Sequence, residues 1–171
     1  MNNCLKVVFG DITTAKVDAI VNAAKPSLMG GSGVDGAIHR AAGADLLEKC
    51  MEIKAFNGVR CPTGQVRITG SGNLSCKYVI HAVGPIYSVD ETPSLHLECA
   101  YKNSIKAAKI NNCKSIAFPA ISCGKYGYPY LEAVKIAVAT CRNSTDIDIY
   151  FYVLDSKLLA HYTKALSFSM D

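Results

Sequence analysis

The chain has 171 residues, of which 50% are hydrophobic and 19% charged, and its formal net charge is +4. This composition is sufficient to bury a core, so it predicts one folded domain over residues 1–171 and excludes a disordered chain. The apolar runs are far shorter than the roughly 20 residues that span a bilayer, and the N-terminus lacks the apolar stretch of a secretory signal. We therefore expect a soluble cytoplasmic protein, or a nuclear one in a eukaryote, with no membrane partner.

The charged residues and the cysteines exclude two further classes of protein. Lysines and arginines are scattered without a run of three, whereas a duplex-DNA binder usually clusters them. The mild positive charge suits a small anionic ligand instead. No two of the eight cysteines lie within nine residues of each other, so the close pairs of zinc and redox sites are missing. We expect reduced thiols that mostly fill the core, and no metal site.

The first half of the chain predicts three strands and two helices. Residues 4–9 and 19–23 are short apolar runs, which are typical of buried strands. A cluster of glycines follows, and then come two helix-like segments, 34–42 and 44–55. Residues 78–83 predict the third strand, which a glycine-proline pair ends.

The second half begins with two helices around a short strand. Thr92, followed by proline, has the residue type of an N-cap, and the helix after it carries one apolar stripe. Residues 115–118 predict a strand that a proline ends. After a loop with glycines, a further helix presents one apolar face, made of Leu131, Val134, Val138 and Cys141.

The C-terminal part predicts a last strand, 147–154, covered on both faces, and a last helix capped by Asp155. Strands that alternate with helices predict the α/β class, with three layers in the order α/β/α. Ligands of such sheets bind beyond the carboxyl ends of the strands. We therefore expect a site in the loops after Ala23, Val83 and Phe118.

The first of these loops contains a glycine-rich segment, Gly30-Gly31-Ser32-Gly33, directly before a predicted helix. A match to G-x-G-x-x-G ends at Gly36, but several residues separate the strand from the glycines, which disfavours a dinucleotide-binding unit. The physical element remains, because glycines allow close backbone approach and N–H groups at a helix N-terminus attract phosphate. The alternative is a plain tight turn.

A second loop of this kind follows the strand at 115–118 and contains Ser122, Cys123, Gly124, Lys125 and Tyr126. Two glycine-bearing loops at neighbouring strand ends can hold the two halves of a pyrophosphate. The Walker pattern is absent, which disfavours a P-loop NTPase. Tyr126 is a candidate for stacking on a ring, and its alternative role is a lid on the core.

Asp35 and His39 are four residues apart at the start of the predicted helix, and therefore lie on one face. The carboxylate can orient the imidazole, although an acidic residue in a first turn also stabilises a helix without any function. His81, in the middle of a strand, is predicted to be a hydrogen-bonded core histidine. No pattern indicates a nucleophilic serine or cysteine.

Several of these segments together resemble one family, the macro domain. They are GDIT at 10–13, VNAA at 21–24, GGSGVDGAIHRAAG at 30–43, IHAVGP at 80–85 and AFPAISCGKYGYP at 117–129. Their order and spacing hold over nearly the whole chain. The likeness is to MacroD-type enzymes, which include bacterial O-acetyl-ADP-ribose deacetylases.

The resemblance implies a central mixed sheet of six or seven strands and a site for ADP-ribose, without a cofactor. Asp11 would accept a hydrogen bond from the adenine amino group, the loop 30–36 would wrap the pyrophosphate and distal ribose, and the loop 122–126 would close the other side. The ligand-binding positions so implied are Asp11, Ile12, Asn22, Gly30, Gly31, Ser32, Gly33, Val34, Ser122, Cys123, Gly124, Lys125, Tyr126 and Leu154.

For catalysis the resemblance implies Asp35 as the carboxylate near the distal ribose, helped by His39, with Lys25 where the family usually has asparagine. The function so implied is hydrolysis of ester-linked groups at the distal ribose, on O-acetyl-ADP-ribose or on ADP-ribosylated acidic side chains of proteins. Lys25 keeps open an alternative from another class, a non-catalytic reader of ADP-ribose or poly-ADP-ribose. Ser32, in place of a glycine, is expected to narrow backbone freedom. RNA is the least favoured ligand.

Overall fold

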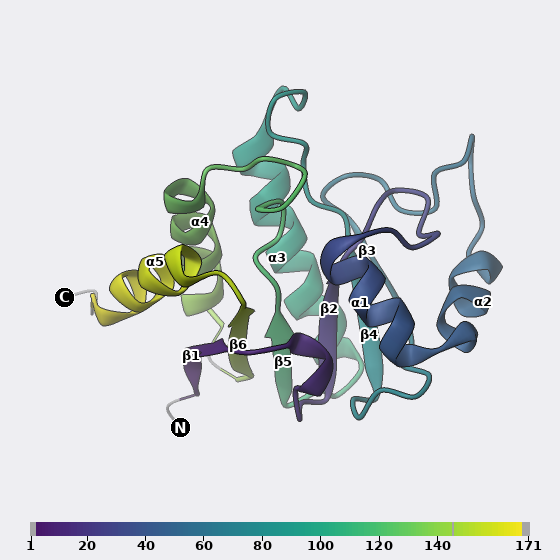
Figure 1. The fold of residues 1–171 in the computed structure, drawn as a ribbon, viewed down its shortest axis with the longest axis horizontal. Coiled ribbons are helices and arrows are strands. Elements are labelled where there is room, and N and C mark those ends of the chain that lie inside the picture. The colour runs from purple at the N-terminus through teal and green to yellow at the C-terminus, as the bar shows by residue number, and fades with distance from the viewer. Residues whose placement is uncertain (1–2, 145, 169–171) are drawn as a thin grey trace.

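The computed structural model describes residues 3–144 and 146–168. Within them, six strands form one sheet in the order β1-β6-β5-β2-β4-β3 (Figure 1). All neighbouring strands are parallel except β3 and β4, so the predicted mixed sheet is confirmed. The strands are β1 (Leu5–Phe9), β2 (Ala19–Ala23), β3 (Val66–Gly70), β4 (Tyr78–Ala82), β5 (Ser115–Phe118) and β6 (Asp148–Val153).

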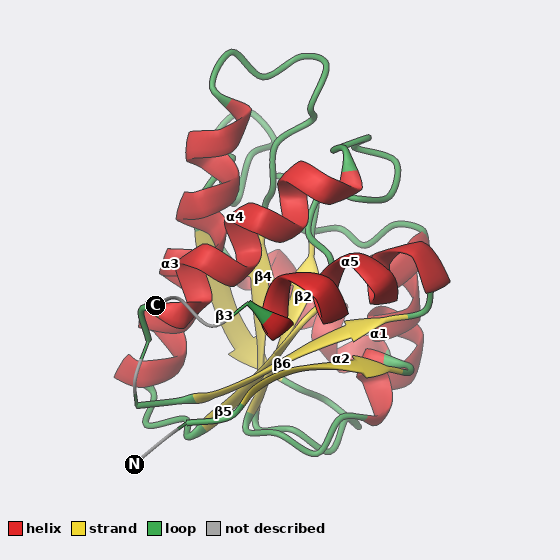
Figure 2. Cartoon of the chain, turned by 90° about the vertical axis from the view of Figure 1, so that its left-hand side faces the viewer, coloured by secondary structure: helices red, strands yellow, loops and turns green. Residues whose placement is uncertain are grey.

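Helices cover both faces of this sheet. One face packs against α1 and α2, and the other packs against α3, α4 and α5. Figure 2 shows the strong twist of the sheet between these layers, so the predicted α/β/α arrangement is confirmed. The helices are α1 (Gly33–Ala42), α2 (Ala44–Glu52), α3 (Pro93–Ile110), α4 (Tyr130–Arg142) and α5 (Ser156–Ser167), and a short 3-10 turn, η1 (Ile12–Thr14), follows β1.

The core on the side of α3, α4 and α5 is aromatic at its centre. Phe118 packs on Phe151, and the ring of Phe151 stacks on Tyr162 with centroids 4.6 Å apart. Such pairs stabilise a core beyond the apolar area that they bury. All eight cysteines are free, and six of them are buried, as the sequence predicts. Burial raises the pKa of the Cys123 thiol to about 12, which keeps it protonated at neutral pH.

The structure differs from the predicted elements at β3 and at the end of α2. The strand β3 was not predicted, because Arg67, Thr69 and a terminal glycine hide its apolar alternation. The helix α2 ends at Glu52 and not at residue 55, because Ile53 adopts an extended conformation and packs into a small cluster beside the sheet. The chain then makes a narrow turn closed by the pair Phe56–Val59.

Three side-chain expectations need correction as well. Thr92 precedes α3, but its side chain caps no described amide, and Asp90 instead accepts from the Thr92 amide at 2.8 Å. Leu131 is 51% exposed because the first turn of α4 directs it away from the buried face. Leu154 lies beyond the end of β6 and is 69% exposed. By contrast, Asp155 caps α5 as predicted, accepting from two amides of its first turn.

Candidate functional site at the carboxyl edge of the sheet

The predicted loops gather at one edge of the sheet. Because β2, β4, β5 and β6 are mutually parallel, the segments that follow them leave from the same edge, toward the top of Figure 1. The loop after β2 leads into α1, the loop after β4 into α3, and the loop after β5 into α4. The structure therefore brings together the loops after Ala23, Val83 and Phe118, as predicted.

Asn22 and Asp35 form the buried centre of this edge. Asn22 is the fourth residue of β2 and is fully buried, whereas Asp35 lies in the first turn of α1 and is 5% exposed. The amide nitrogen Nδ2 of Asn22 donates to Oδ1 of Asp35 at 2.8 Å. Nε2 of His39 lies 3.5 Å from the same oxygen, so the predicted pair does share one helix face.

The same two residues also carry unused hydrogen-bonding capacity. Oδ1 of Asn22 and Oδ2 of Asp35 are buried, and neither has a partner among the described residues. Buried polar atoms are normally paired, and leaving one unpaired destabilises a protein by about 1–3 kcal/mol. Both atoms are acceptors, so the pair offers a place for a ligand that brings hydroxyl groups.

Lys25 lies beside this centre without pairing with it. A Cβ built on Gly31 would lie 3.2 Å from Nζ of Lys25 and 3.0 Å from Oδ2 of Asp35. The ammonium and the carboxylate therefore approach the same point of the glycine loop. Lys25 is exposed and forms no salt bridge with the described carboxylates, so the chain holds a cation near the acid rather than an ion pair.

The glycine loop fits closely against α1. A Cβ at Gly36 would stand 2.5 Å from the carbonyl oxygen of Gly31, so only glycine allows the loop to lie on the helix. Ser32 has φ of −105°, an extended conformation that any residue adopts, so serine in place of glycine causes no backbone strain at this position. The left-handed values fall on Gly30 and Gly33. Val34 follows at the N-terminal end of α1, which favours negative charge.

The loops after β4 and β5 are joined into a second wall. Ser122 has a left-handed φ of 65° and its hydroxyl donates to the carbonyl of Pro85 at 2.8 Å. The amide of Tyr87 donates to the carbonyl of Tyr126 at 2.9 Å. Because its hydroxyl is already bonded, Ser122 would present mainly its backbone to a ligand.

The other residues of the second loop divide into buried and exposed. Cys123 is buried in the core under α3 and α4, so its side chain points away from the site. Gly124 and Lys125 are exposed. Tyr126 is half-buried, and its pKa is raised by burial and by the charge of Asp35.

Asp11, Ile12 and Leu154 lie at the other end of the edge. The amide of Gly10 donates to the carbonyl of Val153 at 3.0 Å, so the residues that follow β1 and β6 are neighbours. Oδ1 of Asp11 accepts from the amide and the hydroxyl of Thr13, at 2.9 and 2.8 Å. Ile12 is buried beneath. Asp11 therefore caps η1 through one carboxylate oxygen.

Sequence reasoning missed the contacts behind Asn22 and two of the residues that make them, Thr69 and Cys50. His81 of β4 is buried, as predicted, and its Nδ1 lies 3.3 Å from Nδ2 of Asn22. Its Nε2 lies 3.0 Å from the hydroxyl of Thr69 and 3.6 Å from Sγ of Cys50. Only the pairing of β2 with β4, which sets Asn22 opposite His81, could have identified this contact.

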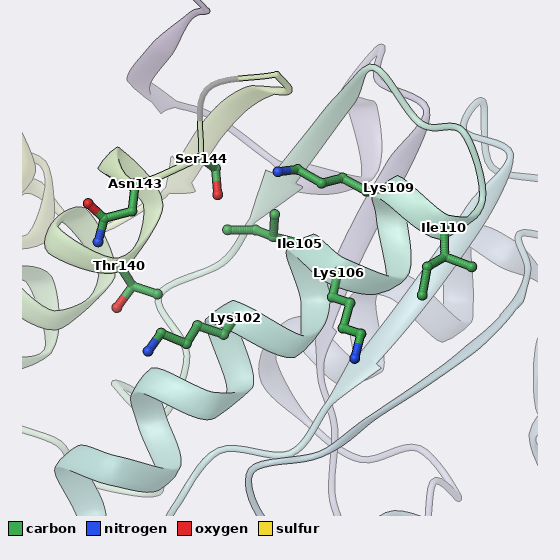
Figure 3. Close-up of a pocket in the computed structure, with 8 residues that line it drawn as sticks. All are labelled: Lys102, Ile105, Lys106, Lys109, Ile110, Thr140, Asn143 and Ser144. Carbon is green, nitrogen blue, oxygen red and sulfur yellow. The ribbon is translucent and has the colours of Figure 1, made fainter.

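A groove of about 370 Å³ lies elsewhere, between α3 and α4 (Figure 3). It is near the C-terminal end of α3, which leads into the first residue of β5, and so is at the opposite edge of the sheet. Two of its lysines form ion pairs, Lys102 with Glu98 and Lys109 with Asp146. The groove contains no predicted site residue; its lining is Lys102, Ile105, Lys106, Lys109, Ile110, Thr140, Asn143 and Ser144.

Two further properties concern the described residues only. No group of three or more His, Cys, Asp or Glu side chains in 3–144 and 146–168 is arranged to hold a metal ion. None of the helices in these ranges has the length and hydropathy needed to cross a membrane.

Known proteins resemble the chain in sequence and in structure. It is 51% identical to a macro domain-containing protein of Vibrio parahaemolyticus, over 96% of this chain and 98% of that protein. It is 50% identical to an O-acetyl-ADP-ribose deacetylase of Citrobacter rodentium, over 98% and 97%. The macrodomain of Oceanobacillus iheyensis with ADP superposes with a TM-score of 0.88 at 40% identity, over 94% of this chain and 88% of that one.

A more distant structure, the Trypanosoma brucei macrodomain in complex with ADP-ribose, has a TM-score of 0.82 at 35% identity, over 94% of this chain and 68% of that one. The family model of the Macro domain matches residues 21–137, a range that contains β2, α1 and the centre formed by Asn22 and Asp35. On this match and the identities of its relatives, the chain belongs to the macro domain family.

Proposed function

We propose that this protein binds ADP-ribose and hydrolyses ester-linked groups at its distal ribose. The observation that carries the proposal is the pair of buried acceptors without described partners, Oδ1 of Asn22 and Oδ2 of Asp35, beside a glycine loop at a helix N-terminus. Relatives of nearly the same length are named O-acetyl-ADP-ribose deacetylase, and similar folds contain ADP or ADP-ribose.

The carboxyl edge suits a ligand that is long and negatively charged at its middle. Asp11 and Leu154 offer a carboxylate and an exposed apolar side chain for adenine at one end. The backbones of 30–34 and 122–126 would hold the pyrophosphate. Asn22 on β2, two strands away from β6 along the sheet, and Asp35 beside it on α1 would receive the hydroxyls of the distal ribose.

The solved structures of the Oceanobacillus iheyensis macrodomain support the choice of residues. Three of them carry single substitutions, of an asparagine, a glycine and an aspartate, spaced by seven and then three residues. Lys25, Ser32 and Asp35 have the same spacing in this chain. The positions that those experiments altered thus correspond in spacing to the ones proposed here.

In the proposed reaction Asp35 acts on water. With a ribose hydroxyl on Asn22, Oδ2 of Asp35 orients a water molecule and accepts a proton as the water oxygen adds to the ester carbonyl carbon. The bond from that carbon to the ribose oxygen then breaks, and the ribose oxygen takes up the proton. General-base assistance of this kind accelerates a reaction by roughly 10²–10⁴-fold. His39, 3.5 Å from Oδ1, would hold the carboxylate in place.

A second candidate is a reader that binds ADP-ribose, free or on a modified protein, without hydrolysing it. Lys25 favours it, because an ammonium attracts the pyrophosphate but is a donor only and cannot replace the two-way hydrogen bonding of an amide. The test is to incubate the purified protein with O-acetyl-ADP-ribose and with a protein mono-ADP-ribosylated on acidic residues, and to follow both products by mass spectrometry. Release of acetate or of ADP-ribose supports the hydrolase.

Binding is tested separately by calorimetry with ADP-ribose and with AMP, which lacks the second phosphate and the distal ribose. We expect clearly tighter binding of ADP-ribose. Binding without turnover on either substrate would establish the reader. Equal affinities for both ligands would contradict the assignment of the two loops to a pyrophosphate.

A further inference from the structure

We propose that Thr69 and His81 are positioning residues, which fix the amide of Asn22 so that its nitrogen holds Asp35 and its oxygen is left for the substrate. The inference rests on the proposed function for its catalytic meaning. Its structural part is a hydrogen-bond chain with one fixed direction, which is independent of that function. The chain links four buried side chains and one backbone carbonyl: Asp35, Asn22, His81, Thr69 and the carbonyl of Gly70.

The direction of the chain is set at its inner end. The hydroxyl of Thr69 lies 2.9 Å from the carbonyl oxygen of Gly70, and a carbonyl can only accept. The single proton of the hydroxyl is therefore used there. Nε2 of His81 lies 3.0 Å from the same hydroxyl oxygen, so the ring must donate, and its proton belongs on Nε2.

The other ring nitrogen of His81 is then an acceptor. A neutral imidazole has one donor and one acceptor, and burial, aided by the charge of His39, lowers the pKa of His81 to about 3. The ring is thus neutral at physiological pH. Nδ1 faces the side-chain amide of Asn22 at 3.3 Å, and only the NH₂ group of that amide can donate to it.

The orientation of Asn22 follows from these two contacts. Its NH₂ group supplies one proton to His81 and the other to Oδ1 of Asp35, at 2.8 Å. The amide oxygen is consequently turned away from both, and it is the buried acceptor that no described residue satisfies. A rotated amide would set its oxygen against the carboxylate, which repels it.

Cys50 offers the ring a second contact, which is weaker. Its Sγ lies 3.6 Å from Nε2, and burial raises the pKa of the thiol to about 11, so it stays protonated. Thiols are weak donors and acceptors. We therefore assign control of the ring to Thr69, and Thr69 is the residue to alter.

The test compares Thr69→Val with Thr69→Ser. Valine keeps the shape and suits a strand but removes the hydroxyl, whereas serine keeps the hydroxyl and removes a methyl group. If Thr69 acts through the chain, serine preserves turnover of O-acetyl-ADP-ribose to within about twofold and valine lowers kcat by roughly tenfold, since misplaced groups slow a reaction. If Thr69 only fills space, serine is the more damaging change and valine is tolerated.

A matched control is Thr140→Val on α4. Thr140 is 8% exposed and Thr69 is 9% exposed, so the same group is removed at the same depth, away from the site. We expect no change in kcat. An equal loss of activity in Thr140→Val and Thr69→Val, or a Thr69→Val enzyme as active as Thr69→Ser, overturns the proposal.

A second measurement does not depend on catalysis. Nitrogen-15 NMR of the assigned His81 ring reports which nitrogen carries the proton. We expect the Nε2–H form in the natural protein and in Thr69→Ser, and a mixture with Nδ1–H in Thr69→Val. The Nδ1–H form in the natural protein contradicts the chain. This result is decisive even if no hydrolysis is found, so failure of the proposed function and failure of the chain are distinguishable.

Discussion

The amide nitrogen of Asn22 lies 2.8 Å from Oδ1 of Asp35, and this bond joins the end of β2 to the first turn of α1. It leaves the other carboxylate oxygen, Oδ2, buried and available. One residue of the strand thus sets both the position of the acid and the oxygen that it can use.

Substituting Asp35→Ala tests whether this acid is catalytic or only stabilises a helix. We expect hydrolysis of O-acetyl-ADP-ribose to fall by at least about 10²-fold, the lower end of general-base assistance, while ADP-ribose affinity measured by calorimetry changes by only a few-fold. Asp45→Ala is the control, because Asp45 is exposed in the first turn of α2. Parallel loss of binding and activity would mean that Asp35 is structural.

Substituting Lys25→Asn is expected to raise turnover. Nζ of Lys25 and Oδ2 of Asp35 approach the same point of Gly31, and an ammonium is a donor only, so it cannot orient a ribose hydroxyl as an amide can. Asparagine removes the charge and restores an amide that can orient a hydroxyl. Steady-state kinetics should show a higher kcat and a smaller change in ADP-ribose affinity.

The control for Lys25 is Lys135→Asn, since Lys135 is also an exposed lysine and lies on α4, on the other face of the sheet from α1. It should leave kcat unchanged. If Lys25→Asn has the same or a lower kcat, the mechanism taken from the family does not apply to this site.

Substituting Asp11→Ala should weaken ADP-ribose binding by roughly two- to tenfold, because a hydrogen bond contributes about 0.5–1.5 kcal/mol net. The carboxylate also caps η1, so a small loss of stability is expected as well. Asp155→Ala removes a comparable cap from α5 and separates the two effects. It should lower the melting temperature and leave the affinity in calorimetry unaltered; equal weakening of affinity in both variants excludes a contact between Asp11 and the ligand.

Stability should fall on acidification because of His81. Burial lowers its pKa from 6.5 to about 3 in the folded state, so between these values the unfolded chain binds a proton that the folded chain does not. The free energy of unfolding therefore rises with pH across this window, by up to about 1.4 kcal/mol per pH unit for one proton. Urea titrations from pH 4 to 7 would measure the slope.

In the variant His81→Gln the free energy of unfolding should rise less steeply with pH, because up to one proton fewer is released on folding. This comparison of slopes does not depend on the absolute stability of the variant. His161→Gln, at a half-exposed position on α5, serves as the comparison. An unchanged slope in His81→Gln would show that this imidazole does not control the acid side of the stability curve.

The sequence contains most of the fold in local patterns. Five elements could be predicted from apolar runs, apolar helix stripes and the glycine or proline residues that end them. They are β2, β4, β5, α1 and α3, and each begins at its predicted first residue or within one residue of it. The strand β3 could not be predicted in this way, because Arg67 and Thr69 are polar. It is recognised as a strand only by its pairing with the buried strand β4. Leu131 was misplaced since several faces of α4 are apolar.

The site was less accessible to this kind of reasoning. The spacing of Asp35 and His39 predicts their shared face, because a helix turn is local. The contact of Asn22 with His81 depends on strand order. The effect of the Asp35 charge on the pKa of Tyr126 depends on how the loops after β2 and β5 fold. Such relationships are tertiary, and no period along the chain encodes them.

The bond from Ser122 to Pro85 has a consequence for how a ligand would enter. A Cβ at Gly84 would stand 2.2 Å from Oγ of Ser122, so the segments after β4 and β5 are closely packed on each other. The facing segment, 30–33, is held by backbone packing instead, because a Cβ at Gly36 would stand 2.5 Å from the carbonyl oxygen of Gly31. Both walls would therefore be largely formed before a ligand arrives, which limits the conformational entropy lost by the complex.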